Sequence, residues 1–476
     1  NGGVASGGLR HGSGDVGAGG GKRGDAALEE HRLKSDAEAI NAMTVAALST
    51  LDRHPKQQLV VQVRYAVSEN MRQLEVVHRL LSSASSHKLQ VVRLPERSVV
   101  DRLIAQSALQ PGTVSFYRKV LQFSKQAGFR WVDVPAVGSQ LHNGDAWAYG
   151  ELRRRFHGCL PVGYASATDE QVNLNPDDSC HVHPGDKMLV LQRGSLGSQV
   201  VLSAGPGPYS DGAMRAAVRT AGRPAIELPA VAVIVAGWPA GELEELVEGF
   251  VGFAPPGSKI TFLLSELPED LPESDEVELQ FDVVADPLSP GALLDAGVET
   301  ADAVVLGCPE HLEYPDSDAL ILSTLYEIQQ LMEQSCRVVH VVSKLHSNAT
   351  RAVAKASLRQ LSRPAVTFEL ITANSMAAAT LVQVAYEPLM SQVCSELMIM
   401  GEGNELYCLP LHHLGISPGE TLTVAEIYEA ARALQMTMVG LMRRGGARLD
   451  VAPPPDVSVT VHQDHMVITI ANLINE

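Results

Sequence analysis

Residues 231–237 read Val-Ala-Val-Ile-Val-Ala-Gly, and this short apolar run decides the fold class. A run of small and β-branched residues that ends at a glycine is typical of a buried strand entering a turn. An acidic helix is expected at 242–252 and a second apolar strand at 259–264. Strands that alternate with helices in this way predict an α/β fold with a parallel sheet.

The alternation continues toward the C-terminus. After an acidic stretch from 266 to 286, we expect a strand at 303–306, a helix at 317–333 and a strand at 337–342. Helices near 375–399 complete a Rossmann-like domain, which we assign to residues 230–399. The remaining segment, 400–476, is assigned to a small α+β module.

A similar order precedes this domain. Apolar residues at helical and strand spacing predict half of a second parallel-sheet domain. Its expected elements are a helix from Ser35, a strand at 59–63, a helix at 69–81, a strand at 89–93 and a helix at 97–109. The partial domain is assigned to residues 35–125, and a linker to 194–229. Between them, residues 126–193 are assigned to a first small module, with strands expected at 160–165, 171–174 and 187–191. Residues 1–34 are rich in Gly and poor in apolar residues, so they predict a disordered tether.

An internal repeat supports this order. Pro161–Tyr164 matches Met438–Leu441, and Leu174–Asp177 matches Val451–Pro454. A third match follows in the same order, between Val182–Val190 and Val461–Ile468. We therefore predict a tandem duplication, in which two similar units superpose. Repeats of this size usually build a larger surface rather than one catalytic cleft.

Composition limits the classes of function. With 476 residues, several domains are expected. The formal charge of −18 disfavours nucleic acid and anionic membrane surfaces as partners. Six cysteines without a C-x-x-C spacing argue against a disulfide framework and favour a reducing compartment. No window holds the ~18 consecutive apolar residues of a membrane span, and because the chain begins at Asn1 we expect any membrane anchor to lie upstream.

A nucleotide site would need a glycine-rich turn after the first strand of a Rossmann-like domain. The turn that begins at Gly237 continues with Trp238 and Pro239, whose side chains oppose close approach of a pyrophosphate. Glu266 follows the next strand, where a ribose-binding acid would lie, although an exposed carboxylate at a strand end is the simpler interpretation. We therefore predict that NAD does not bind. If it did, Gly237 and Glu266 are the residues that would hold it.

Metal sites have weaker signals. Asp177, Asp178 and Asp186 carry hard oxygen atoms suited to calcium, but they lack the spacing of a calcium-binding loop, and turn capping explains them equally well. His181 and His183 would lie on one face of a strand, as two possible zinc ligands or as surface histidines. No nucleophile, zinc-protease or P-loop motif appears, so we expect no enzymatic activity.

The residues that surround these segments resemble a known family. Ala105–Gly112, Val172–Asp178 and Pro184–Leu191 are similar to the first cytosolic regulator-of-conductance (RCK) unit of the plant CASTOR/POLLUX ion channels. Val235–Trp238, Ala254–Ser258 and Glu402–Leu406 are similar to the second unit. The resemblance extends from about Ser35 to the end, with gaps near 140–158, 194–228 and 267–300. It departs from the family before Ser35, where the pore helices and the first half of the first nucleotide-binding domain are expected.

This resemblance implies a function. It implies the soluble regulatory part of a cation channel subunit in a plastid or nuclear envelope, in which four chains form a ring that senses ions or ligands. One alternative is a scaffold subunit of an envelope assembly, such as a transport or protein-import complex, that retains the ring units without a pore. Another is a redox sensor that binds a dinucleotide, which Trp238 and Pro239 disfavour. Expected partners are other copies of the chain or other subunits of a membrane assembly, with the membrane reached through segments outside this chain.

Two apolar helix stripes are candidates for interfaces between chains. Phe116 and Val120 belong to one stripe, in a helix expected at 114–124, and Leu389 and Val393 belong to the other. The resemblance implies that such faces hold subunits together. The alternative is that each helix packs on a module of its own chain.

Overall fold

The structure is a computed structural model. It describes residues 60–63, 92–122, 127–134, 146–194, 201–202, 209, 226–268, 271–308, 312–333, 335, 337–358, 366–398, 403–443 and 448–473. The described residues from 92 onward belong to one compact unit. The tether at 1–34, the helices expected from Ser35 and at 69–81, and most of the 194–229 linker lie outside the described residues.

A six-stranded sheet forms the centre of the second domain, and every pair of neighbouring strands in it is parallel. Its strand order is β13-β12-β11-β14-β15-β16. The strands are β11 (Ala232–Ala236), β12 (Lys259–Leu264), β13 (Glu278–Val283), β14 (Ala303–Leu306), β15 (Val339–Leu345) and β16 (Val366–Thr372). The α/β fold class is therefore confirmed.

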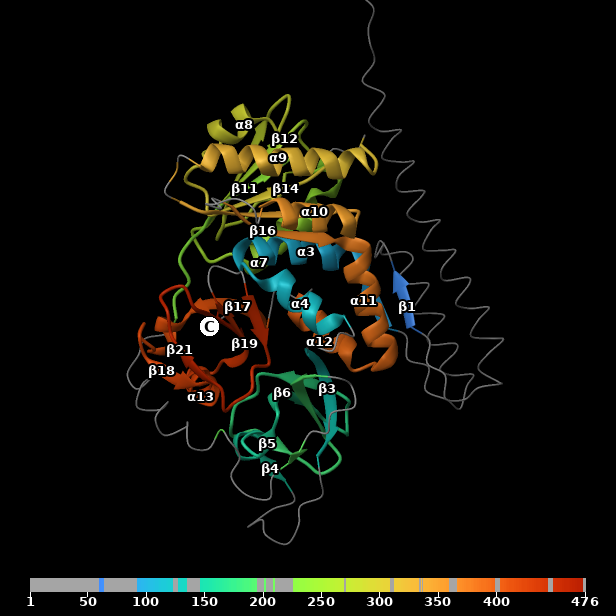
Figure 1. The fold of residues 1–476 in the computed structure, drawn as a ribbon. Coiled ribbons are helices and arrows are strands. Elements are labelled where there is room, and N and C mark those ends of the chain that lie inside the picture. The colour runs from blue at the N-terminus through green and yellow to red at the C-terminus, as the bar shows by residue number, and fades with distance from the viewer. Residues whose placement is uncertain are drawn as a thin grey trace, which may run out of the picture. The chain divides into compact units, whose positions relative to one another are not determined.

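Alternate residues along the strands face two separate cores, as the pleat requires. Val233 and Val235 of β11 pack with α7 (Leu243–Phe253) and α3 (Glu96–Leu109). Ile234 and Ala236 face the other core. That core includes α8 (Pro290–Asp295), α9 (Asp316–Met332) and α10 (Asn348–Leu358). Figure 1 shows α9 on one side of the sheet and α3 with α7 on the other.

The helix expected at 97–109 forms as α3, but it packs on a different sheet from the one expected. We placed it in the partial first domain, whereas α3 lies against α7, β14 and β15 of the second. Between Val99 and Gln110 every residue except Arg102 is buried. Such a helix needs neighbours on several sides. The described parts of the first domain are otherwise β1 (Val60–Val63) and β2 (Val92–Pro95), which overlap the strands expected at 59–63 and 89–93.

The two small modules share one topology, which confirms the repeat. Their four-stranded antiparallel sheets have the orders β3-β9-β6-β7 and β17-β22-β19-β20. The strands are β3 (Ala127–Asp133), β6 (Cys159–Ala165), β7 (Val172–Leu174), β9 (Lys187–Arg193), β17 (Glu405–Pro410), β19 (Thr437–Arg443), β20 (Arg448–Val451) and β22 (Met466–Ala471). A bulge falls between Pro161 and Gly163 in one module and between Met438 and Gly440 in the other.

Shorter elements complete the modules. Two-stranded pairs join β4 to β8, β5 to β10 and β18 to β21. These elements are β4 (Trp147–Ala148), α5 (Tyr149–Arg153), β5 (Phe156–His157), β8 (His181–Val182), β10 (Val201–Leu202), η2 (Leu411–Leu414), β18 (Thr421–Thr423), α13 (Val424–Arg432) and β21 (Ser458–Thr460).

The repeat includes the helices that precede each module. α3 corresponds to α11 (Ala373–Tyr386), and α4 (Thr113–Leu121) corresponds to α12 (Met390–Met398). Each helix begins and ends 277 residues before its counterpart, since α3 starts at 96 and α11 at 373. Backbone details repeat at the same spacing: φ is 46° at Asn175 and 45° at Ala452.

The bulge glycines give a matched pair of substitutions. A Cβ at Gly163 would lie 2.2 Å from the carbonyl oxygen of Asn173, whereas a Cβ at Gly440 would lie 3.3 Å from that of Asp450. Because a backbone clash of 2.2 Å forces the strands apart, Gly163→Ala is expected to lower the free energy of unfolding by about 2–3 kcal/mol. Gly440→Ala should cost less than half of this. Urea unfolding of the two variants measures the difference, and equal losses would contradict this packing.

Among the described helices, none has both the length and the apolar character needed to cross a membrane.

Candidate functional site

The carboxyl edge of the parallel sheet is where an open α/β sheet would bind a nucleotide. Gly237 has a φ of 72°, as expected for a glycine turn, but its Cα lies against the side chain of Leu288, which a Cβ would approach to 3.0 Å. Trp238 is buried, and its Nε1 donates to the carbonyl of Glu242 at 3.1 Å. Glu266 is exposed beyond the end of β12. Packed side chains thus lie where the glycine-rich turn would receive a pyrophosphate.

Because packed side chains occupy the turn, we expect that NAD does not bind there, and a binding measurement tests this. Glu244 and Glu245 in the first turn of α7 add negative charge beside the turn, which opposes a pyrophosphate. We expect titration calorimetry with NADH to show no saturable binding below about 1 mM. Saturation near 1 μM that is lost in Glu266→Gln would contradict this prediction.

The structure gives the aspartates proposed for calcium other partners. Asp186 accepts from the backbone N–H of Ala167 and of His183, so it closes a turn. Asp177 accepts from the N–H of Ser179 and from Gln435. Asp178 is paired with arginines. Within the described residues no three His, Cys, Asp or Glu side chains form a metal-binding group, and calcium at these aspartates stays a prediction.

The paired histidines share one side of the chain but not one strand. β8 contains His181 and Val182 only, and His183 begins the turn that Asp186 closes. His181 and His183 are both exposed on either side of the buried Val182, so they lie on the same side of the chain, although the strand itself ends at Val182.

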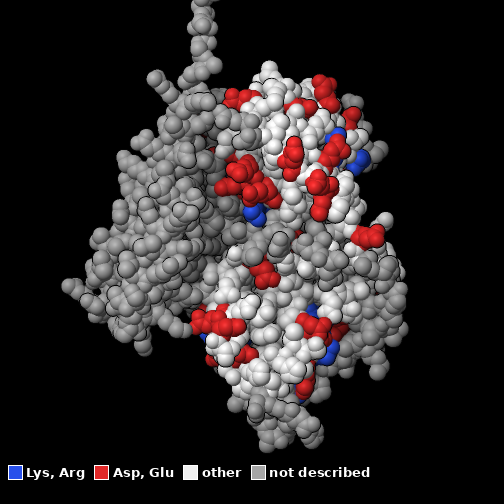
Figure 2. Space-filling view, turned by 180° about the vertical axis from the view of Figure 1, so that it is seen from behind, with Lys and Arg blue, Asp and Glu red and all other residues white. Residues whose placement is uncertain are grey.

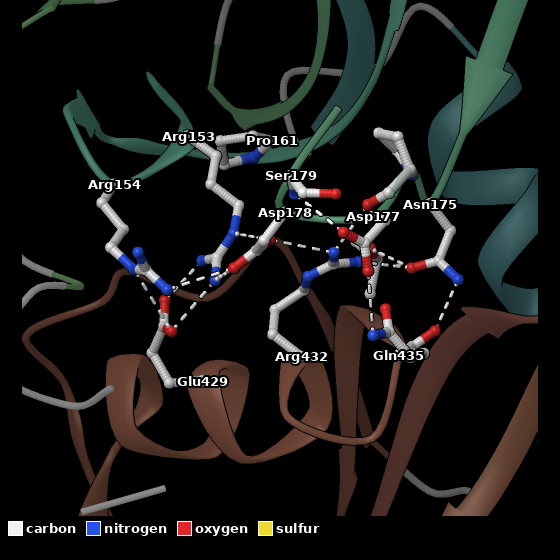
Figure 3. A network of polar contacts seen from close by, with 12 residues as sticks. Arg153, Arg154, Pro161, Asn175, Asp177, Asp178, Ser179, Glu429, Arg432 and Gln435 are labelled. Atoms are coloured by element: carbon white, nitrogen blue, oxygen red, sulfur yellow. Dashed lines mark hydrogen bonds and ion pairs between the residues drawn. The ribbon is translucent and has the colours of Figure 1, made fainter. Parts of the chain in front are cut away.

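A cluster of charged side chains joins the two small modules, and we name it the inter-module network (Figure 3). It comes from the end of α5, the loop after β7, and α13. Its members are Arg153, Arg154, Asn175, Asp178, Glu429 and Arg432.

Arg153 is the centre of the network. Its side chain is 1% exposed, and Nε and Nη2 each donate to one carboxylate oxygen of Asp178 at 2.8 Å. Nη1 donates to Oε1 of Glu429 at 2.5 Å, and Glu429 is 3% exposed. Nη2 also donates to Oε2 of Glu429 at 3.1 Å. Both partners therefore receive two charge-assisted hydrogen bonds from one guanidinium, which is the arrangement that fixes orientation most firmly.

Arg432 makes the reciprocal connection. It lies on α13 of the second module and donates to Asp178 at 3.0 Å and to the carbonyl of Pro176 at 2.7 Å. It also donates to Oδ1 of Asn175. Each module thus sends a buried arginine into the other, so the two modules cannot separate without exposing uncompensated charge.

The electrostatics fit this description. Burial opposes ionisation of Asp178, but the hydrogen bonds and charge of Arg153, with Arg432 and Arg154, lower its pKa to about 2. The network therefore remains ionised above about pH 4, the ordinary range of the group, and loses this stabilisation only as the pH falls toward 2.

Tyrosines surround the network. The hydroxyl of Tyr428 donates to the carbonyl of Pro161 at 2.8 Å, and that of Tyr209 donates to the carbonyl of Cys159 at 2.9 Å. The two rings lie 5.0 Å apart. Burial raises the pKa of Tyr428 to about 12, so it acts as a donor at neutral pH. The Tyr428 contact fastens module two to the strand β6 of module one, and Tyr209, from the segment assigned to the linker, binds the same strand.

A second connection reaches from the parallel sheet to α4. Glu369 on β16 is buried and accepts from the N–H of Gly112 at 3.0 Å and of Ser115 at 2.9 Å. Gly112 has no side chain to cap the helix, so Glu369 caps it from another element. Burial raises the pKa of Glu369, although these hydrogen bonds lower it. The sheet and the modules are thus joined through α4.

Three of the four residues proposed as an interface between chains are buried within the chain. Phe116, Val120 and Val393 are at most 1% exposed and belong to the main core. Leu389 is half-buried and packs against the same core. The interface hypothesis is therefore wrong for Phe116, Val120 and Val393, for which the intramolecular alternative holds, and it stays a prediction for Leu389. The reason is that α4 packs on β3, β17 and α11 of its own chain.

Glu405 predicts a pH dependence of stability. It lies on β17 with 2% exposure, and burial raises its pKa to about 8, although the Tyr407 hydroxyl that donates to it at 3.0 Å lowers the pKa. A carboxyl whose pKa is raised on folding stabilises the protein fully below about pH 4.5 and loses this contribution as the pH rises toward 8. Glu405→Gln should therefore flatten the fall in unfolding free energy between pH 5 and 8. Urea unfolding across this range tests it, with the exposed Glu299→Gln as control. An unchanged slope in Glu405→Gln would contradict it.

Sequence reasoning did not find the inter-module network. Arg153 and Glu429 are 276 residues apart, so no local spacing marks them. One signal was available: the Asn-Pro-Asp-Asp turn at 175–178 has charged residues in only one copy of the repeat, since its counterpart at 452–455 is Ala-Pro-Pro-Pro.

Comparison with known proteins agrees with this architecture. Residues 97–199 match the family described as Castor and Pollux, part of voltage-gated ion channel. The ion channel DMI1 of Medicago truncatula is 22% identical over 90% of this chain and 48% of its own length. The ion channel POLLUX of Lotus japonicus is 22% identical over 90% of this chain and 47% of its own length. The chain thus spans about half the length of the relatives it matches.

Among solved structures, the human SLO3 gating ring has the same fold. It aligns with a TM-score of 0.58 at 12% identity, over 92% of this chain and 85% of the SLO3 chain. The resemblance predicted from the sequence is confirmed: this chain is similar to the CASTOR/POLLUX ion channels and has the tandem RCK-type fold of a gating ring.

Proposed function

We propose that this chain is the regulatory region of a CASTOR/POLLUX-type cation channel in an organelle envelope, where it responds to an ion or ligand. In this proposal its residues have no catalytic role. The observation that carries the proposal is the match to POLLUX over 90% of the chain, together with the gating-ring fold. In this function the chain acts with other copies of itself at the membrane surface.

The contacts that join the two modules and the parallel sheet are suited to transmitting a movement from one unit to the other. The inter-module network joins the modules through reciprocal buried arginines, and Glu369 joins the parallel sheet to α4. A displacement at one unit is therefore passed to the other instead of being absorbed between them.

The chain carries more acidic than basic side chains, which disfavours direct contact with an anionic membrane. Figure 2 shows that acidic side chains outnumber basic ones on the described face that it presents. The segment 271–302 carries nine Asp and Glu residues and no Lys or Arg. Such a surface is repelled by phosphate groups, so we propose that the membrane is reached through other segments of the assembly.

Purification from native membranes tests the proposal. The tagged chain is isolated from envelope membranes in mild detergent, and the mass and composition of its complex are measured by native mass spectrometry. The channel function predicts four identical subunits whose own polypeptide provides the membrane spans. A complex of many different subunits, with no pore formed by this gene product, would instead support the scaffold alternative.

A further inference from the structure

The duplicated helix pairs turn at two equivalent corners. The first corner, between α3 and α4, is Gln110-Pro111-Gly112, and the second, between α11 and α12, is Glu387-Pro388-Leu389. Their backbones agree, because the N–H of Gln110 donates to Gln106 and the N–H of Glu387 donates to Gln383. Any difference between the corners therefore lies in their side chains.

The first corner is closed. Gln110 is buried, and its Oε1 accepts the N–H of Cys408 on the edge strand β17 at 2.9 Å. A carboxamide from the corner thus satisfies a peptide group that points away from the sheet. Leu109 and Cys408 are both buried beside this contact.

The second corner is open. A cavity of about 270 Å³ lies between it and the edge strand β3. Its lining includes Phe129 and Trp131 of β3, and Tyr386, Glu387 and Met390 of the corner. The remaining lining residues are Val120, Gln122, Ala127, Gly128, Arg130, Gly194 and Gln383.

The strand register places Trp131 at the position of Cys408. Trp131 pairs with Leu189, which pairs with Gly163, and Cys408 pairs with Ile468, which pairs with Gly440. Inward and outward peptide groups alternate along an antiparallel strand. Because the N–H of Val134 points inward to Asp186, that of Trp131 points outward to the edge that lines the cavity, as Cys408's does.

Two polar groups at this cavity are unpaired among the described residues. The outward-pointing backbone N–H of Trp131 has no acceptor there. Glu387, which replaces Gln110, is half-buried, and its carboxylate pairs with no cation in the part of the chain that the structure describes. A peptide N–H at a cavity wall without an acceptor costs free energy, so a ligand that pairs it gains affinity.

We propose that this cavity binds a small zwitterion of amino-acid size. Its ammonium group pairs with the carboxylate of Glu387, its carboxylate oxygen accepts from the backbone N–H of Trp131, and its side chain packs on Phe129, Tyr386 and Met390. The volume lies just below the ~300 Å³ at which pockets for drug-sized ligands begin, so it suits a metabolite. The aromatic walls add cation–π attraction for the ammonium. The use of this site for sensing rests on the proposed function. Ligand binding does not, because it depends only on the residues of this chain.

Fluorine NMR of the full chain labelled with 5-fluorotryptophan tests the proposal. The chain has three Trp residues, so three resonances are expected, and Trp131→Phe assigns one of them. Each protein-forming L-amino acid is added at about 1 mM. We expect at least one amino acid to move the Trp131 resonance in a saturable way and to leave those of Trp147 and Trp238 in place.

Two controls identify the contacts. Glu387→Gln should weaken binding about tenfold or more, because a charge-assisted hydrogen bond is lost, while its urea midpoint stays unchanged; the exposed Glu244→Gln should bind as the parent does. The N-acetylated form of the same amino acid should not bind. If no amino acid moves the Trp131 resonance, or if Glu387→Gln or N-acetylation leaves the affinity intact, the proposal is overturned. A failure here leaves the native-complex measurement, and thus the proposed function, unaffected.

Discussion

Replacing Arg153 with methionine is expected to lower the free energy of unfolding by about 3–5 kcal/mol, because it leaves the buried carboxylate of Glu429 without its closest cation. The bidentate pair with Asp178 is lost in the same step. The methionine keeps the apolar stem, so the loss reports the charge rather than an empty volume. Urea unfolding at pH 7, followed by circular dichroism, measures it.

Arg155 supplies the matched control for this variant. It lies two residues away in the same segment and pairs with Glu151 at 2.6 Å on the surface, where Glu151 is 48% exposed. Arg155→Met should cost less than about 1 kcal/mol. The double variant Arg153→Met with Glu429→Met should regain part of the loss, because no buried charge remains at that position. Equal stability of Arg153→Met and the parent chain would show that the network does not hold the modules together.

Phe116→Ala is expected to cost about 3–5 kcal/mol of unfolding free energy without changing the oligomeric state. The ring is fully buried, and it packs edge-on against Phe129 at 6.4 Å between centroids. Because the ring packs inside one chain, its removal opens a cavity instead of releasing a partner. Unfolding curves and size-exclusion chromatography with light scattering measure the two effects.

Val353→Ala on α10 is the control, since Val353 is 55% exposed and should contribute little. The observation that would restore the interface hypothesis is a Phe116→Ala chain of parental stability that dissociates into smaller species.

The central strands of the parallel sheet could be predicted from the sequence because they are buried on both faces. β11 and β14 are continuous apolar runs between turn residues. β13 and β16, which the sequence analysis missed, are the two edges of the same sheet. β13 is exposed or half-buried along its whole length and lies in an acidic stretch. An edge strand needs no continuous apolar pattern, so the sequence does not mark β13; this reason does not extend to β16, which is largely buried.

The position of α3 could not be predicted for a different reason. Its residues form a helix where expected, but the choice of sheet depends on contacts with α7 and β15, which are distant in the sequence. The inter-module network has the same property, because Arg432 and Asp178 are 254 residues apart. Local patterns give elements and repeats, whereas the pairing of units follows from long-range packing.

The most direct test of the account is to exchange the corresponding region of the Lotus japonicus POLLUX channel for residues 92–476 of this chain and to record currents in planar bilayers. If this chain is a gating-ring region, the chimera should conduct, and Arg153→Met within it should change the open probability at least about threefold, while Arg155→Met should not. A chimera that conducts with the same open probability in all three forms would show that the chain does not control the pore, and would contradict the proposed function.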